Sequence, residues 1–271
     1  RLEYIMRFVL WLAYFYVCDA GAVAWGLADH GGDFSTVSVL LEGNVKDLVT
    51  TSSAFAALMT DGRVVAWGDP HAGGDTSSVS KSLHNVTFVM SNDCAFVALR
   101  SDNATVTWGN STCGGDSASV SSLLRSATIV SGNARSFLAV IDKGDTSTFV
   151  TSGDPQSGGQ VPKGVDLTNG SFFYVTDEAY LMEFVSDSGE SDRFVTWGNP
   201  DFGGKASKAA ERMMKNSSFR IGSSSCAFTI YSTETVAPKV EAWGNPECGG
   251  DSSSVKLPEH IMVDAYGCKS T

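Results

Sequence analysis

One short pattern returns along the whole chain: Trp-Gly, four variable residues, and then Gly-Gly. Ser152-Gly153 stands in one gap of the series as a degenerate copy, and successive copies are 42, 41, 44, 45 and 46 residues apart. The tryptophans of the pattern are Trp25, Trp67, Trp108, Trp197 and Trp243. A regular period of this length predicts a series of similar supersecondary modules that pack on their neighbours.

Each repeat also contains the pattern of three short strands. Residues 86–91 predict a first strand, residues 54–59 and 95–100 predict second strands that begin near an aromatic residue, and residues 63–68 predict a third strand that ends in Trp-Gly. Turn sequences at 60–62 and 101–103 join the second and third strands. Small sheets repeated at this period are typical of β-propeller blades, so the predicted fold is all-β.

A short helical turn is expected after the Gly-Gly of each repeat. Apolar residues four apart, such as Val37 and Leu41, would form one stripe that packs on the sheet. Aspartates that follow the Gly-Gly pairs are expected to cap these turns, namely Asp33, Asp75, Asp116 and Asp251. The alternative, a calcium loop, is disfavoured because the dense alternating carboxylates of such loops are missing.

The repeat resembles a known family. The stretch AFAALMTDGRVVAWGDPHAGGD at 54–75 is similar to the regulator-of-chromosome-condensation repeat, and GDPQSGGQVPKGV at 153–165 resembles the shorter repeats of beta-lactamase inhibitor protein II. The resemblance covers residues 15–271 and implies a β-propeller. Gly-Gly-Asp mostly replaces the family's Gly-Gln-Leu-Gly, which is a departure from its pattern.

The ends of the chain suggest how such a propeller would close. Residues 260–268 resemble a first strand, and residues 15–26 resemble a second and a third strand, so together they would complete one blade. This predicts a single domain of six blades over 15–271, with seven blades or an open array as alternatives. Residues 1–14 remain as a possible signal-like leader, whereas residues 15–25, the second half of the apolar stretch, are expected to form a buried strand.

The cysteines fall at equivalent positions of different repeats. This pattern predicts the disulfides Cys94–Cys113 and Cys226–Cys248. The proposed closing blade contains both Cys18 and Cys268 and predicts a third disulfide between them, with free buried thiols as the alternative for all six. Disulfides would place the protein in an oxidising compartment, so it is expected to be secreted or extracellular, with a cytoplasmic location as the alternative. Sequons for N-glycosylation at Asn85, Asn103, Asn110, Asn169 and Asn216 agree with a secreted glycoprotein.

The net charge and the motifs of the sequence narrow the range of possible functions. The formal net charge is −11, and the sequence has no Lys/Arg cluster for nucleic-acid phosphates. No membrane span, catalytic motif, metal site or cofactor is expected. The four histidines have no mutual metal-ligand spacing.

The loops between Trp-Gly and Gly-Gly are therefore the candidate binding site for a protein partner. Residues chosen from them are Asp29, His30, Asp69, His71, Asp201, Phe202 and Glu247. The predicted function is non-enzymatic protein binding by a monomeric propeller. Alternatives are the repeat region of a larger regulatory protein, of guanine-nucleotide exchange or ubiquitin-ligase type, and a carbohydrate-binding or hydrolytic propeller.

Overall fold

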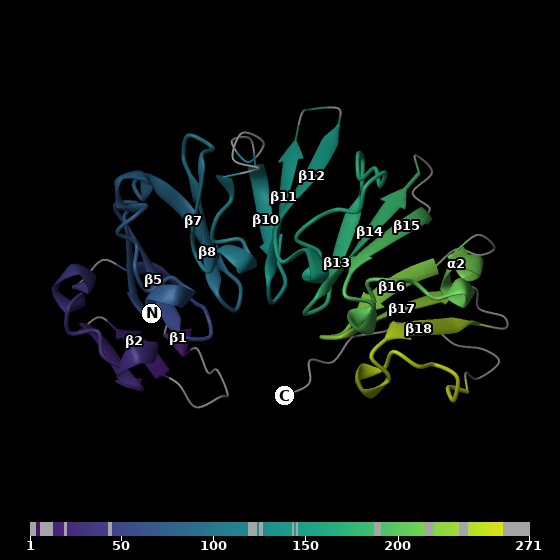
Figure 1. Ribbon diagram of the computed structural model, residues 1–271, viewed down its shortest axis with the longest axis horizontal. Coiled ribbons are helices and arrows are strands. Elements are labelled where there is room, and N and C mark those ends of the chain that lie inside the picture. Colours follow the sequence, from purple (N-terminus) through teal and green to yellow (C-terminus); the bar gives the residue numbers. More distant parts are fainter. Residues whose placement is uncertain are drawn as a thin grey trace. The chain divides into compact units, whose positions relative to one another are not determined.

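The computed structural model describes residues 4–5, 13–18, 21–42, 45–118, 124, 127–142, 144, 146–186, 191–214, 219–232 and 238–256. The chain divides into two compact units, unit 1 with residues 1–141 and unit 2 with residues 142–271, and Figure 1 labels many of their strands. Whether residues 15–271 act as a single domain, as the sequence predicts, stays a prediction. In the described ranges, no helix has the length and apolar character needed to cross a membrane.

Unit 1 consists of small antiparallel sheets in which consecutive strands pair in chain order, as the sequence predicts. Two of its sheets are β4-β5-β6 and β7-β8-β9, and β10 pairs with β11. The strands of this unit are β1 Tyr4–Ile5, β2 Ala13–Cys18, β3 Gly21–Gly26, β4 Val45–Thr50, β5 Ala54–Met59, β6 Val64–Gly68, β7 Val86–Ser91, β8 Ala95–Arg100, β9 Thr105–Gly109, β10 Ala127–Gly132 and β11 Ser136–Asp142. The last strand, β11, ends at the boundary of unit 1.

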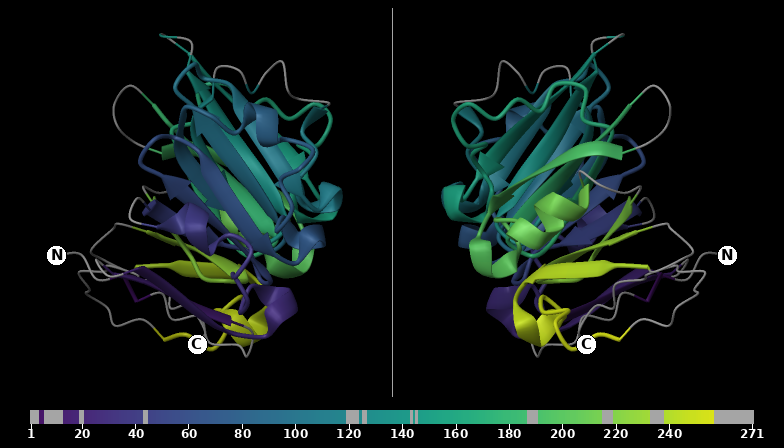
Figure 2. Two further views of the ribbon diagram at one scale, coloured as in Figure 1. Left: turned by 90° about the vertical axis from the view of Figure 1, so that its left-hand side faces the viewer. Right: turned by 90° about the vertical axis from the view of Figure 1, so that its right-hand side faces the viewer.

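Unit 2 repeats the same arrangement, with the sheets β13-β14-β15 and β16-β17-β18. A seven-residue helix, α2 (Lys208–Met214), lies between them in the chain and packs on β15, β17 and β18 (Figures 1 and 2). The strands of this unit are β12 Ser147–Gly153, β13 Phe172–Val175, β14 Ala179–Val185, β15 Ser191–Gly198, β16 Phe219–Ser223, β17 Ala227–Ser232 and β18 Val240–Gly244.

The first sheet of unit 1 has the order β1-β2-β3. Tyr4 and Ile5 pair with Val17 and Tyr16 of β2. The sequence predicts that a strand at 260–268 pairs with this same edge of β2. That segment lies outside the described residues, so closure of a ring by the two chain ends remains a prediction. The interpretation of residues 1–14 as a leader also remains a prediction.

Neighbouring sheets of one unit stack face to face, and the middle strand is buried on both of its faces. All six residues of β5 are buried. Ala56 and Leu58 pack in a cluster with Phe96 and Trp108 of the next sheet, whereas Ala57 packs with residues of the preceding module. A strand covered on both faces needs apolar side chains at every position, which explains the unbroken sequence AFAALM.

The repeat tryptophans join each module to the one before it. Within each unit, the buried indole N–H donates to the carbonyl of the first glycine of the preceding Gly-Gly pair. The Nε1···O distances are 3.1 Å for Trp67 and Gly31, 2.9 Å for Trp108 and Gly73, 3.0 Å for Trp197 and Gly158, and 3.0 Å for Trp243 and Gly203. These four side chains therefore pack between modules, whereas Trp25 is 52% exposed.

The two glycines of a pair are required for different reasons. Gly73 has a φ of 100°, and a Cβ atom there would lie 2.5 Å from Cδ2 of the Phe96 ring. That ring in turn stacks on Trp108 with centroids 5.0 Å apart. Gly74 has no unusual φ, but its Cβ would lie 2.5 Å from the backbone carbon of Gly68. The first glycine supplies the left-handed conformation, and the second allows two backbones to approach.

Short helical segments follow the Gly-Gly pairs of several repeats, and their apolar stripe is as predicted. The segments η2 (Ser38–Leu41), η4 (Ser80–Ser82) and α2 lie at this place in their repeats. Leu41 and Leu83 are buried beneath their turns, at 2% and 4% exposure. Residues 160–171 differ, since they contain turns and no helix, and Pro162 and the left-handed Gly164 interrupt helical geometry there.

The predicted capping by aspartate is wrong for η2 and η4. The residues that precede these segments are Val37 and Val79, and neither makes a side-chain capping bond. Asp33 and Asp75 instead accept the backbone N–H two residues later, from Ser35 at 2.9 Å and Ser77 at 2.8 Å. An Asp side chain closes such a local turn more readily than it reaches a helix that begins five residues further on.

Two of the three expected disulfides are present. Cys94–Cys113 has a Cα–Cα distance of 6.1 Å, and Cys226–Cys248 has one of 5.7 Å. Each joins the turn before a second strand to the Trp-Gly loop of the same module. Cys268 lies outside the described residues, so the pair Cys18–Cys268 stays a prediction.

Candidate protein-interaction surface

The Trp-Gly loops and the turns between first and second strands lie at one end of each sheet. Antiparallel pairing places Gly68, at the end of β6, opposite Ala54, at the beginning of β5. The N–H of Asp69 donates to the carbonyl of Ser53 at 2.8 Å, so the two loops are in contact. We call this the loop end. It comprises residues 27–31, 51–53, 69–73, 92–94, 110–114 and 133–135 of unit 1, and residues 154–158, 176–178, 199–203, 224–226 and 245–249 of unit 2.

The residue after Trp-Gly fixes the conformation of each loop. Asp69 accepts the N–H of His71 at 2.8 Å, and Asn199 accepts that of Asp201 at 3.0 Å. Asn110, Asp154 and Asn245 do the same in their repeats. A 3₁₀ turn follows in every case, and a left-handed glycine ends it. The loops are therefore short, capped turns with little conformational freedom.

The loop end of unit 2 is strongly acidic. Its residue ranges contain no Lys or Arg. They contain the carboxylates Asp154, Asp177, Glu178, Asp201 and Glu247. Asp177, Asp201 and Glu247 are exposed, and the other two are partly exposed. This end therefore carries a negative field that no cation of the same loops neutralises.

The loop end of unit 1 is less acidic. Asp29 and Asp93 are exposed there, and Arg135 lies in one of the same turns. The Nδ1 atom of His30 is 2.9 Å from Oδ1 of Asp29, and this hydrogen bond lowers the pKa of the Asp29 carboxyl below its usual value of 3.8. His71 is exposed.

The opposite end of the sheets has a different charge pattern. We call it the hairpin end, with residues 60–63, 83–86 and 101–104 in unit 1 and residues 167–171 in unit 2. Two of its carboxylates are paired, because Asp61 lies 2.7 Å from Arg63 and Asp102 lies 2.8 Å from Arg100. Both pairs lie in unit 1, and each cancels its charge locally.

The residues selected from the sequence have different places in this surface. Asp29, His71, Asp201 and Glu247 are exposed loop residues, and His30 is partly exposed. Asp69 caps its own turn, so part of its hydrogen-bonding capacity is already used. Phe202 is only partly exposed and packs against the core of unit 2. Whether any of them contacts a partner stays a prediction.

The choice of loops in the sequence missed three acidic residues of this surface. Asp93, Asp177 and Glu178 lie in turns between first and second strands, outside the Trp-Gly loops. The available signal was the antiparallel order of the strands, which places both kinds of loop at the same end. In the described part of the chain, no group of three or more His, Cys, Asp or Glu residues is arranged to hold a metal ion.

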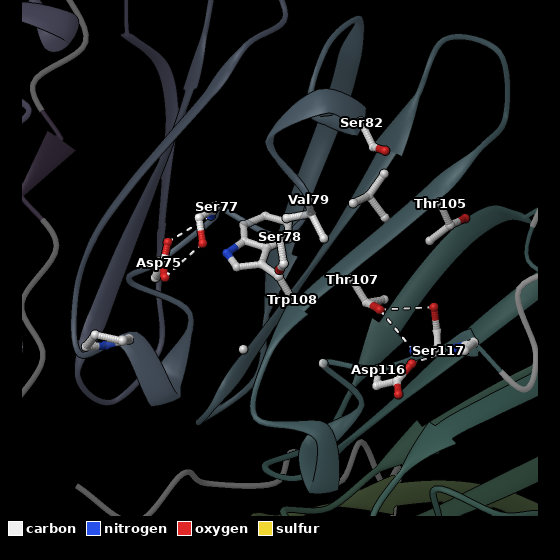
Figure 3. Close-up of a pocket in the computed structure, with 15 residues that line it drawn as sticks. Asp75, Ser77, Ser78, Val79, Ser82, Thr105, Thr107, Trp108, Asp116 and Ser117 are labelled. Atoms are coloured by element: carbon white, nitrogen blue, oxygen red, sulfur yellow. Dashed lines mark hydrogen bonds between the residues drawn. The ribbon is translucent and has the colours of Figure 1, made fainter.

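A groove of about 620 Å³ lies between two modules of unit 1 (Figure 3). Hydroxyl groups line it, among them Ser78, Ser82 and Thr105. One of its two carboxylates, Asp75, accepts hydrogen bonds from both the N–H and the hydroxyl of Ser77. Trp108 is only 2% exposed, so its ring offers no face on which a sugar could stack. The groove is thus a consequence of module packing, with several of its polar groups already used by local turns.

Comparison with known proteins gives structural matches alone. No protein-family model matches the chain, and no curated protein matches its sequence. Prp20p from Saccharomyces cerevisiae is 13% identical with a TM-score of 0.46, over 86% of this chain and 70% of that one. The ectodomain of receptor kinase CR4 from Physcomitrella patens is 12% identical with a TM-score of 0.44, over 86% of this chain and 59% of that one. Human WBSCR16 is 13% identical with a TM-score of 0.40, over 70% of this chain and 60% of that one.

Proposed function

We propose that this protein is a non-enzymatic propeller that binds a cationic surface of another protein through its loop end. The observation that carries the proposal is the loop end of unit 2, where five carboxylates lie in loops whose sequences contain no Lys or Arg. A rigid surface of one charge favours a partner of the opposite charge and accelerates its association. The residues proposed for contact are Asp177, Glu178, Asp201 and Glu247.

The rigidity of the loops supports a binding role. Cys248 fastens one acidic loop to Cys226 at the beginning of β17, and the Nδ2 of Asn199 donates to Glu178 at 2.6 Å. Loops that are ordered before association lose little conformational entropy when a partner binds. The same rigidity would serve an inhibitor or a scaffold, and both are protein-binding roles.

We also propose that the protein works in an oxidising compartment outside the cytoplasm. The two disulfides support this location, because such bonds persist where thiols are not kept reduced. Titration of thiols in the native protein, with and without reductant, tests it. Free thiols at Cys94, Cys113, Cys226 and Cys248 in freshly isolated protein would contradict it.

The binding proposal is tested with purified proteins as probes. The intact chain is immobilised and exposed to strongly basic, neutral and acidic proteins of similar size. We expect binding of basic proteins only, weakened by salt. The variant Asp201→Asn/Glu247→Gln should weaken it by about three- to tenfold, because each exposed charge contributes a fraction of the association energy.

A matched control removes the same number of charges at the other end of the sheets. The variant Asp61→Asn/Asp102→Asn changes two exposed carboxylates of the hairpin end and should leave binding unchanged. Equal losses in both variants, or equal binding of neutral proteins, would reject the loop end as the site. Turnover of a hydrolase substrate panel, or binding of glycans alone, would favour the alternative functions.

A further inference from the structure

Three sequon asparagines share an uncommon backbone conformation. Asn85, Asn103 and Asn169 have φ angles of 53°, 62° and 61°, and among the described residues they are the non-glycine residues with positive φ. Asparagine tolerates this left-handed region better than most residues, which suits it to tight turns. All three side chains are exposed.

All three asparagines belong to the hairpin end of their own unit. Asn103 lies in the turn between β8 and β9, where its N–H donates to the carbonyl of Arg100 at 3.0 Å. Asn85 directly precedes β7, and its carbonyl accepts the N–H of Ser101 at 2.9 Å. Asn169 precedes β13 in unit 2, and its N–H donates to the carbonyl of Ser147 at 3.1 Å.

These hydrogen bonds use backbone atoms and leave the side-chain amides exposed. Within the described residues, no hydrogen bond involves the Nδ2 atom of Asn85, Asn103 or Asn169. A bulky group on Nδ2 would therefore extend into solvent without displacing a partner. The sequons are completed by Thr87, Thr105 and Ser171, at the spacing that N-glycosylation requires.

Asn110 is the contrasting case. It lies at the loop end, where its Oδ1 accepts both the N–H of Thr112 at 2.9 Å and the hydroxyl of Thr112 at 2.8 Å. The amide is thus fixed against the next turn, directly before the disulfide-bonded Cys113, and Asn110 is only partly exposed. Asn216 lies outside the described residues.

We propose that Asn85, Asn103 and Asn169 carry N-linked glycans and that Asn110 does not. In the reaction, Nδ2 forms a bond to the anomeric carbon of an oligosaccharide carried on a lipid diphosphate. The bond from that carbon to the diphosphate oxygen breaks, the lipid diphosphate leaves with the electron pair, and Nδ2 loses one proton. The glycans cover the hairpin end and leave the loop end open to a partner.

This inference rests on the proposed oxidising location, and its test is separate from the test of that location. The chain is produced in eukaryotic cells behind a cleavable secretion leader, and both secreted and cell-retained protein are collected. Peptide N-glycosidase converts each occupied asparagine to aspartate, which mass spectrometry of peptides identifies. We expect conversion at Asn85, Asn103 and Asn169 and no conversion at Asn110.

Single variants assign the glycans by electrophoretic mobility. Asn85→Asp, Asn103→Asp and Asn169→Asp should each remove one mobility step, and aspartate also tolerates the left-handed conformation. The control Asn110→Asp should leave the mobility unchanged and still cap its turn, as Asp69 and Asp154 do in their repeats.

Two outcomes would overturn the inference. One is protein that contains the Cys94–Cys113 disulfide but no glycan at the three sites. The other is occupancy of Asn110 equal to that of the three sites. Because the leader delivers the chain to the secretory pathway, either result counts against the glycans, whereas reduced cysteines in the native protein would count against the proposed location alone.

Discussion

Single residues of the repeat are constrained by contacts between modules as well as by local conformation. Gly73 combines a φ of 100° with an aromatic ring 2.5 Å from the place of a Cβ atom, so both constraints act on one residue. Gly164 has a similar φ of 85° but no atom within 4 Å of that place. The two glycines therefore separate the cost of conformation from the cost of crowding.

We expect Gly73→Ala to lower the free energy of unfolding by about 2–4 kcal/mol, because left-handed strain and overpacking against Phe96 add together. Gly164→Ala should cost only about 1 kcal/mol, from the strain alone. Urea denaturation followed by circular dichroism measures both. Equal losses would show that the Phe96 ring moves aside without cost.

Asp69 shows how a residue chosen as a binding candidate also has a structural role. Asp69→Ala removes the acceptor for the N–H of His71 and should lower the free energy of unfolding by about 1 kcal/mol. Asp69→Asn should be nearly neutral, since Asn fills the same place before three other turns. Thermal unfolding of both variants checks this, and an equal loss in both would mean that the charge matters rather than the cap.

The ionised carboxylate of Asp61 makes the stability of the folded state sensitive to acid. The hydrogen bond from Arg63 lowers its pKa below the usual 3.8, so the carboxylate stabilises the folded state above that value. The contribution is lost as the pH falls through the lower pKa of the folded protein. Asp61→Asn should therefore reduce the dependence of stability on pH below 3.8. Acid titrations of both proteins, followed by circular dichroism, make the comparison, and parallel curves would contradict it.

Strands and their order were the most predictable elements. The predicted spans 54–59, 86–91 and 95–100 are those of β5, β7 and β8, because turn residues delimit each apolar run. The starts of the helical turns were predicted less well. Asp33 and Asp75 accept hydrogen bonds from nearby backbone N–H groups, so that a valine directly precedes η2 and η4. Likewise, the loop-end residue Glu178 becomes a neighbour of Asn199 only through strand pairing.

The disulfides stabilise individual modules. Cys226→Ala/Cys248→Ala opens a link between residues 22 apart in sequence, and we expect a loss of about 3 kcal/mol in the free energy of unfolding. Denaturation with and without reductant measures it. With Cys94→Ala/Cys113→Ala added, reductant should act only through the predicted pair Cys18–Cys268. No remaining effect of reductant would contradict that pair.

On the scale of the whole molecule, negative charge is in excess and unevenly placed. The formal net charge is −11, while Asp61 and Asp102 at the hairpin end are neutralised by arginines. Repulsion among the remaining carboxylates opposes the folded state, because folding brings them closer than they are in the unfolded chain. The acidic loop end thus has a cost in stability that a cationic partner would relieve.

Salt should relieve the same repulsion. Raising sodium chloride from about 10 mM to about 200 mM shortens the screening length from roughly 30 Å to below 10 Å, so we expect the unfolding temperature to rise by about 2–4 °C. Asp201→Asn/Glu247→Gln should show a smaller rise in the unfolding temperature than the wild type. Asp61→Asn/Asp102→Asn should not show a smaller rise. The wild type keeps the ion pairs with Arg63 and Arg100, which salt weakens, and this variant has no such pairs to lose. Calorimetry of the three proteins at the two salt concentrations makes the comparison. A salt response that is equal in all three would mean that the carboxylates of the loop end do not repel one another measurably, and the surface would then lack the field on which the proposed partner binding depends.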